Sequence, residues 1–253
     1  MKNILLKIRS LILFLPICLF AQVIDSNKSL ESTPPLFDEV NVNIDGFLDE
    51  EPWSKSLFLS KFTSYLPVDG RPAEDDTHIK IWYTSKALYI GITAWEIHDE
   101  VRSTLADRDN LENDDYILLF LDTYDDQRSA YAFAVNPIGQ QGDGIITDRT
   151  TTLSRNSTLT FNLDDNPDYV FTSKGRLTDR GYVVEIEIPF KSLRYKKSDI
   201  QNWGFNVLRR VQHSGYRSTL FNVNLDVASF LAQSGKLVNI SGIDRDKIFE
   251  ISP

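Results

Sequence analysis

Short runs of alternating polar and apolar residues, separated by turn residues, are the feature that most restricts the fold of this chain. Residues 78–83 alternate before Ser85 and Lys86, and 87–95 follow as a second run. Successive side chains of a strand point to opposite faces, so these runs predict a hairpin with one face in a core. Residues 116–121 are almost wholly apolar, as in a central strand. Similar runs lie at 129–135, 144–147, 169–174, 181–188, 203–211 and 236–240.

The pattern predicts an all-β fold, namely an antiparallel β-sandwich of about ten strands with one or two short helical turns. The expected turns are at 49–55 and 190–193. The sandwich is expected over 40–243. Residues 244–253 are expected to be a tail that begins a further carboxy-terminal region.

The amino terminus has the three parts of a secretory signal peptide. Lys2, Lys7 and Arg9 precede an uncharged apolar stretch at 11–20, and Ala21 is a small residue at the expected cleavage point. The stretch is too short to cross a bilayer, which needs roughly 20 apolar residues in a helix. We therefore expect 1–21 to be removed on export. Residues 22–39 are polar, end near a Pro pair, and predict a flexible leader.

Cleavage would remove the single cysteine and the single methionine of the chain, Cys18 and Met1. Lipid attachment at Cys18 is the alternative, although its neighbours are bulky. A mature chain without cysteine has neither disulfides nor thiolate ligands, so its core must hold the fold. The net charge is −9, which disfavours a phosphate backbone, and no nucleic-acid partner is expected.

Acidic residues gather in one stretch of the chain. Calcium binds several oxygen ligands, so carboxylates around the central strand are candidate ligands for a structural calcium ion. The alternative is a solvated acidic rim balanced by nearby arginines, because the stretch lacks the spacing of an EF-hand. The acidic residues are Asp107, Asp109, Glu112, Asp114, Asp115, Asp122, Asp125 and Asp126.

The four tryptophans are candidates for stacking on the apolar faces of sugars. Core packing is the alternative for each, and it is favoured for Trp53, Trp82 and Trp203. Trp95 stands at a strand end next to Glu96 and His98, so it is expected to be the most exposed.

No catalytic constellation stands out. Glu185 and Glu187 share the face of a strand opposite Val184 and Ile186, and the alternation predicts that this face is solvated. The histidines have no ligand spacing, and hydrolase motifs are absent. The sequence assigns no catalytic residue; an enzymatic role would be that of a glycoside hydrolase acting on O-glycosyl bonds.

Residues 44–53 read IDGFLDEEPW, which resembles the opening of family 9 carbohydrate-binding modules and related DOMON-like sandwiches. The order of later motifs is similar to that of the family: 87–90, Asp114 and Asp115 before an apolar strand closing on Asp122, 133–137, 181–190 and 203–206. The subgroup that it most resembles precedes an outer-membrane β-barrel in secreted proteins of the Bacteroidetes type.

The resemblance implies a β-sandwich, carbohydrate binding and structural calcium, for which Asp114, Asp115 and Asp122 are the expected ligands. Family members hold a terminal sugar between two tryptophans, which correspond to the neighbourhoods of Glu112 and Phe230 here. A polar Asn of the family matches Asn136, whereas its Arg partner matches Ala134, for which Arg128 is a nearby substitute. The expected sugar-binding residues are Asn136, Arg128, Trp95 and Phe230.

The function predicted is that of an exported, non-catalytic domain that binds oligo- or polysaccharide and is associated with polysaccharide breakdown. The expected location is the periplasm, outer membrane or exterior of a Gram-negative bacterium. The alternative is a structural or assembly domain for an outer-membrane β-barrel, with a decayed sugar site. A haem site, known in some DOMON-like sandwiches, would require two histidines, because Met1 leaves with the signal peptide.

Overall fold

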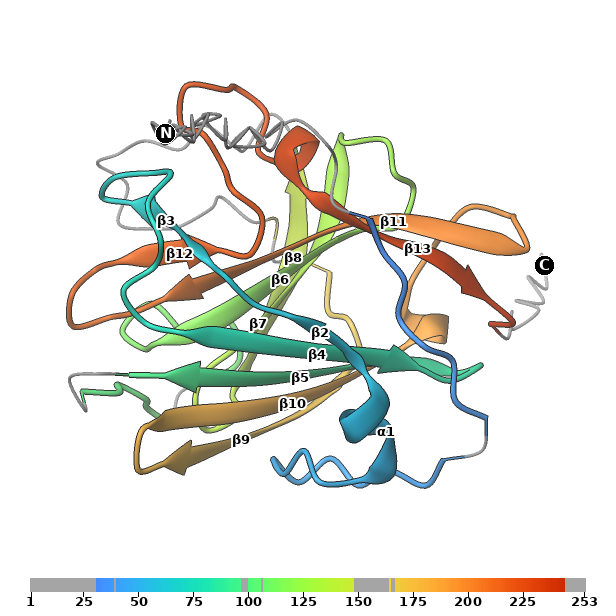
Figure 1. The fold of residues 1–253 in the computed structure, drawn as a ribbon, viewed down its shortest axis with the longest axis horizontal. Helices are drawn as coiled ribbons and strands as arrows, with labels where there is room; N and C mark the ends of the chain where they lie inside the picture. The colour runs from blue at the N-terminus through green and yellow to red at the C-terminus, as the bar shows by residue number, and fades with distance from the viewer. Residues whose placement is uncertain are drawn as a thin grey trace, which may run out of the picture.

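The computed structural model describes residues 31–38, 40–96, 100–105, 107–147, 164 and 167–243. Within them, thirteen strands form two sheets that pack face to face (Figure 1). The predicted all-β sandwich is therefore confirmed. The signal peptide 1–21, the first part of the leader, His98 and the tail 244–253 lie outside the described residues.

One sheet has five strands in the spatial order β2-β4-β5-β10-β9, and all neighbours are antiparallel. Their register places His78 opposite Thr93 and Glu185 opposite Gly91. The strands are β2 (Leu57–Leu59), β4 (Thr77–Tyr83), β5 (Ala87–Trp95), β9 (Thr172–Thr178) and β10 (Gly181–Pro189).

The other sheet has eight strands, with the path β1-β13-β11-β6-β7-β8 and with β12 joining β11 to β3. The β1–β13 pair is parallel and the others are antiparallel. The strands are β1 (Glu31–Ser32), β3 (Thr63–Leu66), β6 (Tyr116–Asp122), β7 (Ser129–Val135), β8 (Gln141–Thr147), β11 (Ile200–Arg210), β12 (Arg217–Thr219) and β13 (Gly235–Ser241).

In the part of the chain that the structure describes, helix is limited to α1 (Glu51–Lys55) and the single 3-10 turns η1 (Phe190–Ser192) and η2 (Leu231–Gln233). The first two fall where the sequence predicts helical turns. Among the described residues, no helix has the length and apolar character that a membrane span requires.

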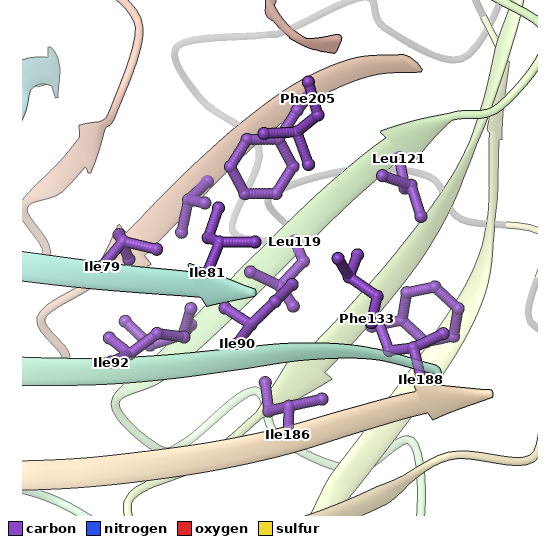
Figure 2. Packing of buried hydrophobic residues seen from close by; sticks show 14 of the residues in the cluster. Ile79, Ile81, Ile90, Ile92, Leu119, Leu121, Phe133, Ile186, Ile188 and Phe205 are labelled. Atoms are coloured by element: carbon purple, nitrogen blue, oxygen red, sulfur yellow. The ribbon is translucent and has the colours of Figure 1, made fainter. Parts of the chain in front are cut away.

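The main core lies between the two sheets (Figure 2). Ile79 and Ile81 of β4 and Ile90 and Ile92 of β5 point toward the eight-stranded sheet, which contributes Leu119 among others. All five side chains are at most 1% exposed. In β4 and β5, the apolar residues that alternate in the sequence are therefore the ones whose side chains lie in this core.

The long strands were predicted and the short ones were not. The predicted strand 169–174 is displaced, since β9 is Thr172–Thr178. The sequence analysis missed β1, β2, β3 and β12, which have two to four residues each. Such short segments contain too few residues for alternation to be visible.

The second part of the expected flexible leader lies against the sandwich. Glu31 pairs with Lys236 and Ser32 with Leu237. Further along, the Phe37 amide donates to the Tyr83 carbonyl at 2.9 Å. Backbone hydrogen bonds thus connect residues 31–38 to both sheets, and the flexibility of the leader stays a prediction.

The outer face of the five-stranded sheet is half covered, which corrects the prediction of a solvated face at Glu185 and Glu187. The IDGFLDEEPW segment and the residues before it pack on this face, and Trp53 contacts Trp82 with ring centroids 5.5 Å apart. Glu185 is fully buried and Glu187 is half-buried. The alternation correctly places both glutamates opposite the main core, but another part of the chain covers them.

The outer face of the eight-stranded sheet carries a second apolar cluster. Leu118 and Phe120 of β6 and Leu208 of β11 pack there with Tyr65 of β3 and Phe230. This face is therefore also covered over part of its area, by β3 and by the chain that precedes β13.

Candidate functional site

Phe230, expected to form one side of a sugar clamp, is a core residue. It is 1% exposed, and its ring contacts Phe120 at 4.9 Å and Tyr65 at 6.1 Å between centroids. As placed, the ring has no face open to a ligand. Glu112, at the position of the other clamp residue, is exposed and not aromatic. The clamp implied by the resemblance is thus not assembled from these two residues.

Asn136 is buried at the turn between β7 and β8, and its side chain is fully engaged. Its amide nitrogen donates to the Asp114 carboxylate at 2.7 Å and to the Thr104 carbonyl at 3.1 Å. Its amide oxygen accepts from the backbone N–H groups of Ile138 and Gln140. These bonds close the turn, so the contacts of Asn136 are structural; its role in sugar binding stays a prediction.

A row of polar and aromatic side chains begins at Tyr116, the first residue of β6. Tyr116 is the direct partner of Arg210 on β11, and Arg210 is the direct partner of Arg217 on β12. The Arg210 guanidinium lies 5.6 Å from the centre of the Tyr116 ring. Direct cross-strand partners share a face, so the three form the Tyr116–Arg210–Arg217 row at one end of the outer face of the eight-stranded sheet.

Two positive charges face each other in this row. Like charges directly opposite each other destabilise a sheet. Burial, together with the repulsion from Arg210, lowers the pKa of Arg217. Buried polar atoms without a hydrogen-bond partner in the described residues include Arg210 Nε and the Tyr65 hydroxyl. Tyr65 is fully buried, so only the exposed part of the half-buried Arg210 guanidinium is open to hydroxyl or carboxylate oxygens of a ligand.

Arg128 lies far from this row, whereas the Trp95 carbonyl accepts a hydrogen bond from Arg209, the neighbour of Arg210. Arg128 stands at the opposite end of β7 from Asn136, roughly 25 Å away along an extended chain, and it is exposed. Arg128 therefore does not replace the missing arginine beside Asn136. Trp95 belongs to the five-stranded sheet, in the other layer. The four expected sugar-binding residues do not converge on one site.

The tryptophans otherwise follow the sequence analysis. Trp53, Trp82 and Trp203 are at most 1% exposed, and Trp95 is half-buried. Trp95 packs edge-on against His78 with centroids 4.4 Å apart.

Asp114, Asp115 and Asp122 do not converge on one point. Asp115 precedes β6 and Asp122 is its last residue, so the two lie roughly 23 Å apart along the strand. Asp114 accepts hydrogen bonds from the Thr104 hydroxyl and the Asn136 amide. Asp115 accepts one from the N–H of Gln212, which follows β11. Asp122 instead closes the β6–β7 turn by accepting from Tyr124 and Gln127 N–H groups.

Burial raises the pKa of Asp115 to about 6, against the opposing effects of the Gln212 N–H and Arg209. Burial also raises the pKa of Asp122. These are the properties of carboxylates embedded in the protein, and calcium binding by these aspartates stays a prediction.

A different acidic group does converge. Among the described residues, Asp109, Asp143 and Asp168 bring one carboxylate oxygen each within 4.8 Å of the others. Asp143 already pairs with the Arg108 guanidinium and accepts from the Tyr169 N–H at 2.6 Å. Arg108 thus supplies positive charge to this group.

Comparison with known proteins places these features in a family. The family model described as "Carbohydrate family 9 binding domain-like" matches residues 44–224. The chain belongs to this family. The match begins at the IDGFLDEEPW segment, so the segment that covers the five-stranded sheet is part of the family 9 domain.

Solved structures support the same fold. A family 9 carbohydrate-binding module from Caldicellulosiruptor kristjanssonii is similar in complexes with cellotriose and with glucose, at TM-score 0.55 and 15% identity in both. The alignments cover 86% and 85% of this family 9 chain and 98% of the module. A candidate carbohydrate-binding protein from Bacteroides uniformis has TM-score 0.57 and 12% identity, covering 81% and 99%. At these identities the likeness concerns the fold. No curated protein sequence matches the chain.

The Tyr116–Arg210–Arg217 row was missed by the sequence analysis. Arg210 ends a run whose other members are mainly core residues, and Arg217 belongs to a strand of three residues. A visible signal was the pair Arg209–Arg210 at the end of an apolar strand, since adjacent strand residues face opposite sides. The two-sheet arrangement was needed to show which of them faces outward with Arg217.

Proposed function

We propose that this family 9 domain is an exported, non-catalytic carbohydrate-binding domain associated with polysaccharide breakdown. Family membership over residues 44–224 is the observation that carries the proposal. The solved modules in complex with cellotriose and glucose have the same fold, which supports a glucose-containing oligosaccharide as the first ligand to test.

The Tyr116–Arg210–Arg217 row is the proposed sugar-binding site. It lies on the face where the resemblance places the sugar, near Asn136 and Glu112. The Arg210 guanidinium is half-buried beside an aromatic ring and makes no ion pair with the described residues. Guanidinium donors bind sugar oxygens through planar, paired hydrogen bonds.

Calorimetric titration of the chain with glucose, cellotriose and other oligosaccharides tests this function. We expect measurable heat of binding with the wild type. The affinity of Arg210→Ala should be at least tenfold lower, because a charge-assisted hydrogen bond is lost. Arg128→Ala is the matched control, since Arg128 is an exposed arginine at the far end of β7. Absence of heat with any oligosaccharide would refute the function, and equal loss in both variants would refute the site.

The alternative is a structural or assembly domain for an outer-membrane β-barrel. The burial of Phe230 and the absence of an aromatic residue at Glu112 favour it, because the clamp implied by the resemblance is missing. Co-purification of the chain with a barrel protein from the native membrane, together with no oligosaccharide binding, is the result that would select it.

A further inference from the structure

A cavity of about 180 Å³ lies at the opposite end of β6 from the proposed sugar-binding site, on the other face of the eight-stranded sheet. Its apolar wall is a cross-strand row, in which Leu121 of β6 pairs with Tyr131 of β7, and Tyr131 pairs with Ile145 of β8. Leu121 belongs to the main core and Tyr131 packs against it. The wall is therefore on the inner face of the sheet, at the margin of the core.

The segment that connects η1 to β11 covers one side of the cavity. The Arg194 N–H donates to the Tyr131 hydroxyl at 2.8 Å, and the Thr123 hydroxyl donates to the Arg194 carbonyl at 2.6 Å. The Tyr131 ring also contacts Tyr169 edge-on, with ring centroids 4.9 Å apart. The wall and the cover are thus held in place before a ligand binds, which lowers the entropy cost of binding.

The polar groups of the lining are a guanidinium and several hydroxyls. The Arg194 side chain is exposed and makes no hydrogen bond or ion pair with the described residues. Because the Tyr131 hydroxyl accepts from the Arg194 N–H, its own hydrogen remains for a ligand. Ser129 is two residues before Tyr131, so it faces the same side of β7 and adds a hydroxyl that donates and accepts. In the part of the chain that the structure describes, no carboxylate lines the cavity.

The charged residues of the adjoining segments have both signs. They are Asp122, Asp125, Asp126, Arg128, Asp164, Lys196, Lys197 and Lys236. Asp125 pairs with Lys236 at 2.7 Å, and Asp122 accepts from two backbone N–H groups of its turn. An anion would gain from Arg194 but would meet the carboxylates of this turn. The charges therefore select neither a cation nor an anion, and a neutral polar ligand fits best.

The size and the lining together restrict the ligand. Sites for drug-sized ligands measure roughly 300–1,000 Å³, so this smaller cavity holds about one ring rather than a chain of rings. A sugar ring presents apolar C–H groups to an aromatic and aliphatic wall, and hydroxyls to guanidinium and hydroxyl groups. We infer that the cavity binds one neutral sugar residue. The inference rests on the proposed function only for the class of ligand, because the two sites lie on opposite faces and at opposite ends of β6.

Amide NMR titration of the isotopically labelled chain tests the cavity, because the shifted signals report where a ligand binds. The neutral probes are glucose, galactose, mannose, xylose and N-acetylglucosamine, and glucuronate is the anionic probe. We expect at least one neutral sugar to shift the amide signals of Ser129, Tyr131 and Arg194 in a saturable manner at millimolar concentration. Glucuronate should bind no more tightly than glucose. Cellotriose supports the inference either by shifting the same signals, as the end of a chain, or by leaving them to the free monosaccharide.

Two variants alter the cavity in different ways. Arg194→Ala should weaken the affinity for that sugar about tenfold, because a charge-assisted hydrogen bond is lost. Ser129→Leu should abolish the shifts, because the larger side chain occupies the cavity. Lys191→Ala is the matched control for Arg194→Ala, since Lys191 is an exposed cation of η1 that does not line the cavity. Each variant is first checked for an unchanged melting temperature, and Ser129→Val is used if Ser129→Leu unfolds.

Unchanged affinity in both Arg194→Ala and Ser129→Leu would overturn the inference. So would shifts confined to the amide signals around Arg210, tighter binding of glucuronate than of every neutral sugar, or no shift with any neutral sugar.

The outcome is separable from that of the oligosaccharide titration. Failure of the cavity leaves the heat of cellotriose binding and its loss in Arg210→Ala unchanged. Failure of the proposed site leaves the shifts at Ser129 and Arg194, and their loss in Ser129→Leu, unchanged.

Discussion

Glu185 provides the sharpest test of how the covered half of the five-stranded sheet is built. Its carboxylate is fully buried, and one oxygen accepts from the N–H groups of Asp45 and Gly46 at 2.9 and 3.0 Å. The other oxygen has no partner among the described residues. Burial raises the pKa of Glu185 from 4.5 to about 7; the two N–H bonds oppose this effect, and nearby Glu50 adds to it.

The sign of the resulting pH dependence follows from proton binding. The native chain holds the Glu185 proton up to about pH 7, whereas the unfolded chain releases it near pH 4.5. The native state thus binds more protons between these values, and the stability from this group falls as pH rises through the interval. The shift corresponds to about 3 kcal/mol, complete below pH 4.5 and lost above pH 7.

Glu185→Gln removes the titration while keeping the shape of the side chain and an oxygen that accepts from Asp45 and Gly46. We expect equal stabilities near pH 4 and a variant more stable than the wild type by up to about 3 kcal/mol at pH 8. Urea unfolding followed by tryptophan fluorescence at several pH values measures the difference. Subtracting the wild-type free energy of unfolding from that of the variant at each pH cancels the titration of other groups, such as Asp115.

Glu51→Gln is the control, because Glu51 is fully exposed and its pKa is lowered by Lys55, the opposite direction. A stability difference for Glu185→Gln that does not change between pH 4.5 and 7, or a variant less stable than wild type at pH 8, would refute the reasoning.

Three further outcomes follow from the structure. Phe230→Ala should lower the free energy of unfolding, measured by urea denaturation, by about 3–5 kcal/mol. The exposed control Val227→Ala should change it by less than about 0.5 kcal/mol. A small effect at Phe230 would show that the ring is not in the core. Asn136→Ala should cost about 2–4 kcal/mol, since it leaves buried Asp114 without one donor and opens the turn; hydrogen exchange at Ile138 and Gln140 reports this directly. EDTA should leave the melting temperature unchanged, because the expected calcium ligands do not converge and Arg108 pairs with Asp143; a fall in the melting temperature that calcium restores would contradict this reasoning.

The long strands could be predicted because their alternation reflects burial on one face. The run around Val184 and Ile186 is one example, and the structure places both in the main core. Alternation does not reveal whether the opposite face meets water or another segment. Glu185 was therefore predicted to be solvated, although Asp45 and Gly46 cover it from a distant part of the sequence.

The site was harder to predict than the fold, since a site requires the spatial position of each residue. Arg128 and Asn136 are close in sequence but stand at opposite ends of one strand. Arg210 and Arg217 lie on neighbouring strands and face each other. The wall of the cavity at the end of β6 is likewise brought together by strand pairing, and the sequence indicated none of its residues.

Gly91 has a consequence for how the family 9 opening motif works. A Cβ atom there would lie 2.6 Å from a Leu48 methyl carbon and 2.8 Å from the Trp53 ring. Leu48 and Trp53 of the motif therefore pack directly on the backbone of β5, and this packing requires a residue without a side chain at Gly91. A chain that carried IDGFLDEEPW with a larger residue at this position of β5 would have to lift the segment from the sheet. The water admitted beneath it would reach Glu185.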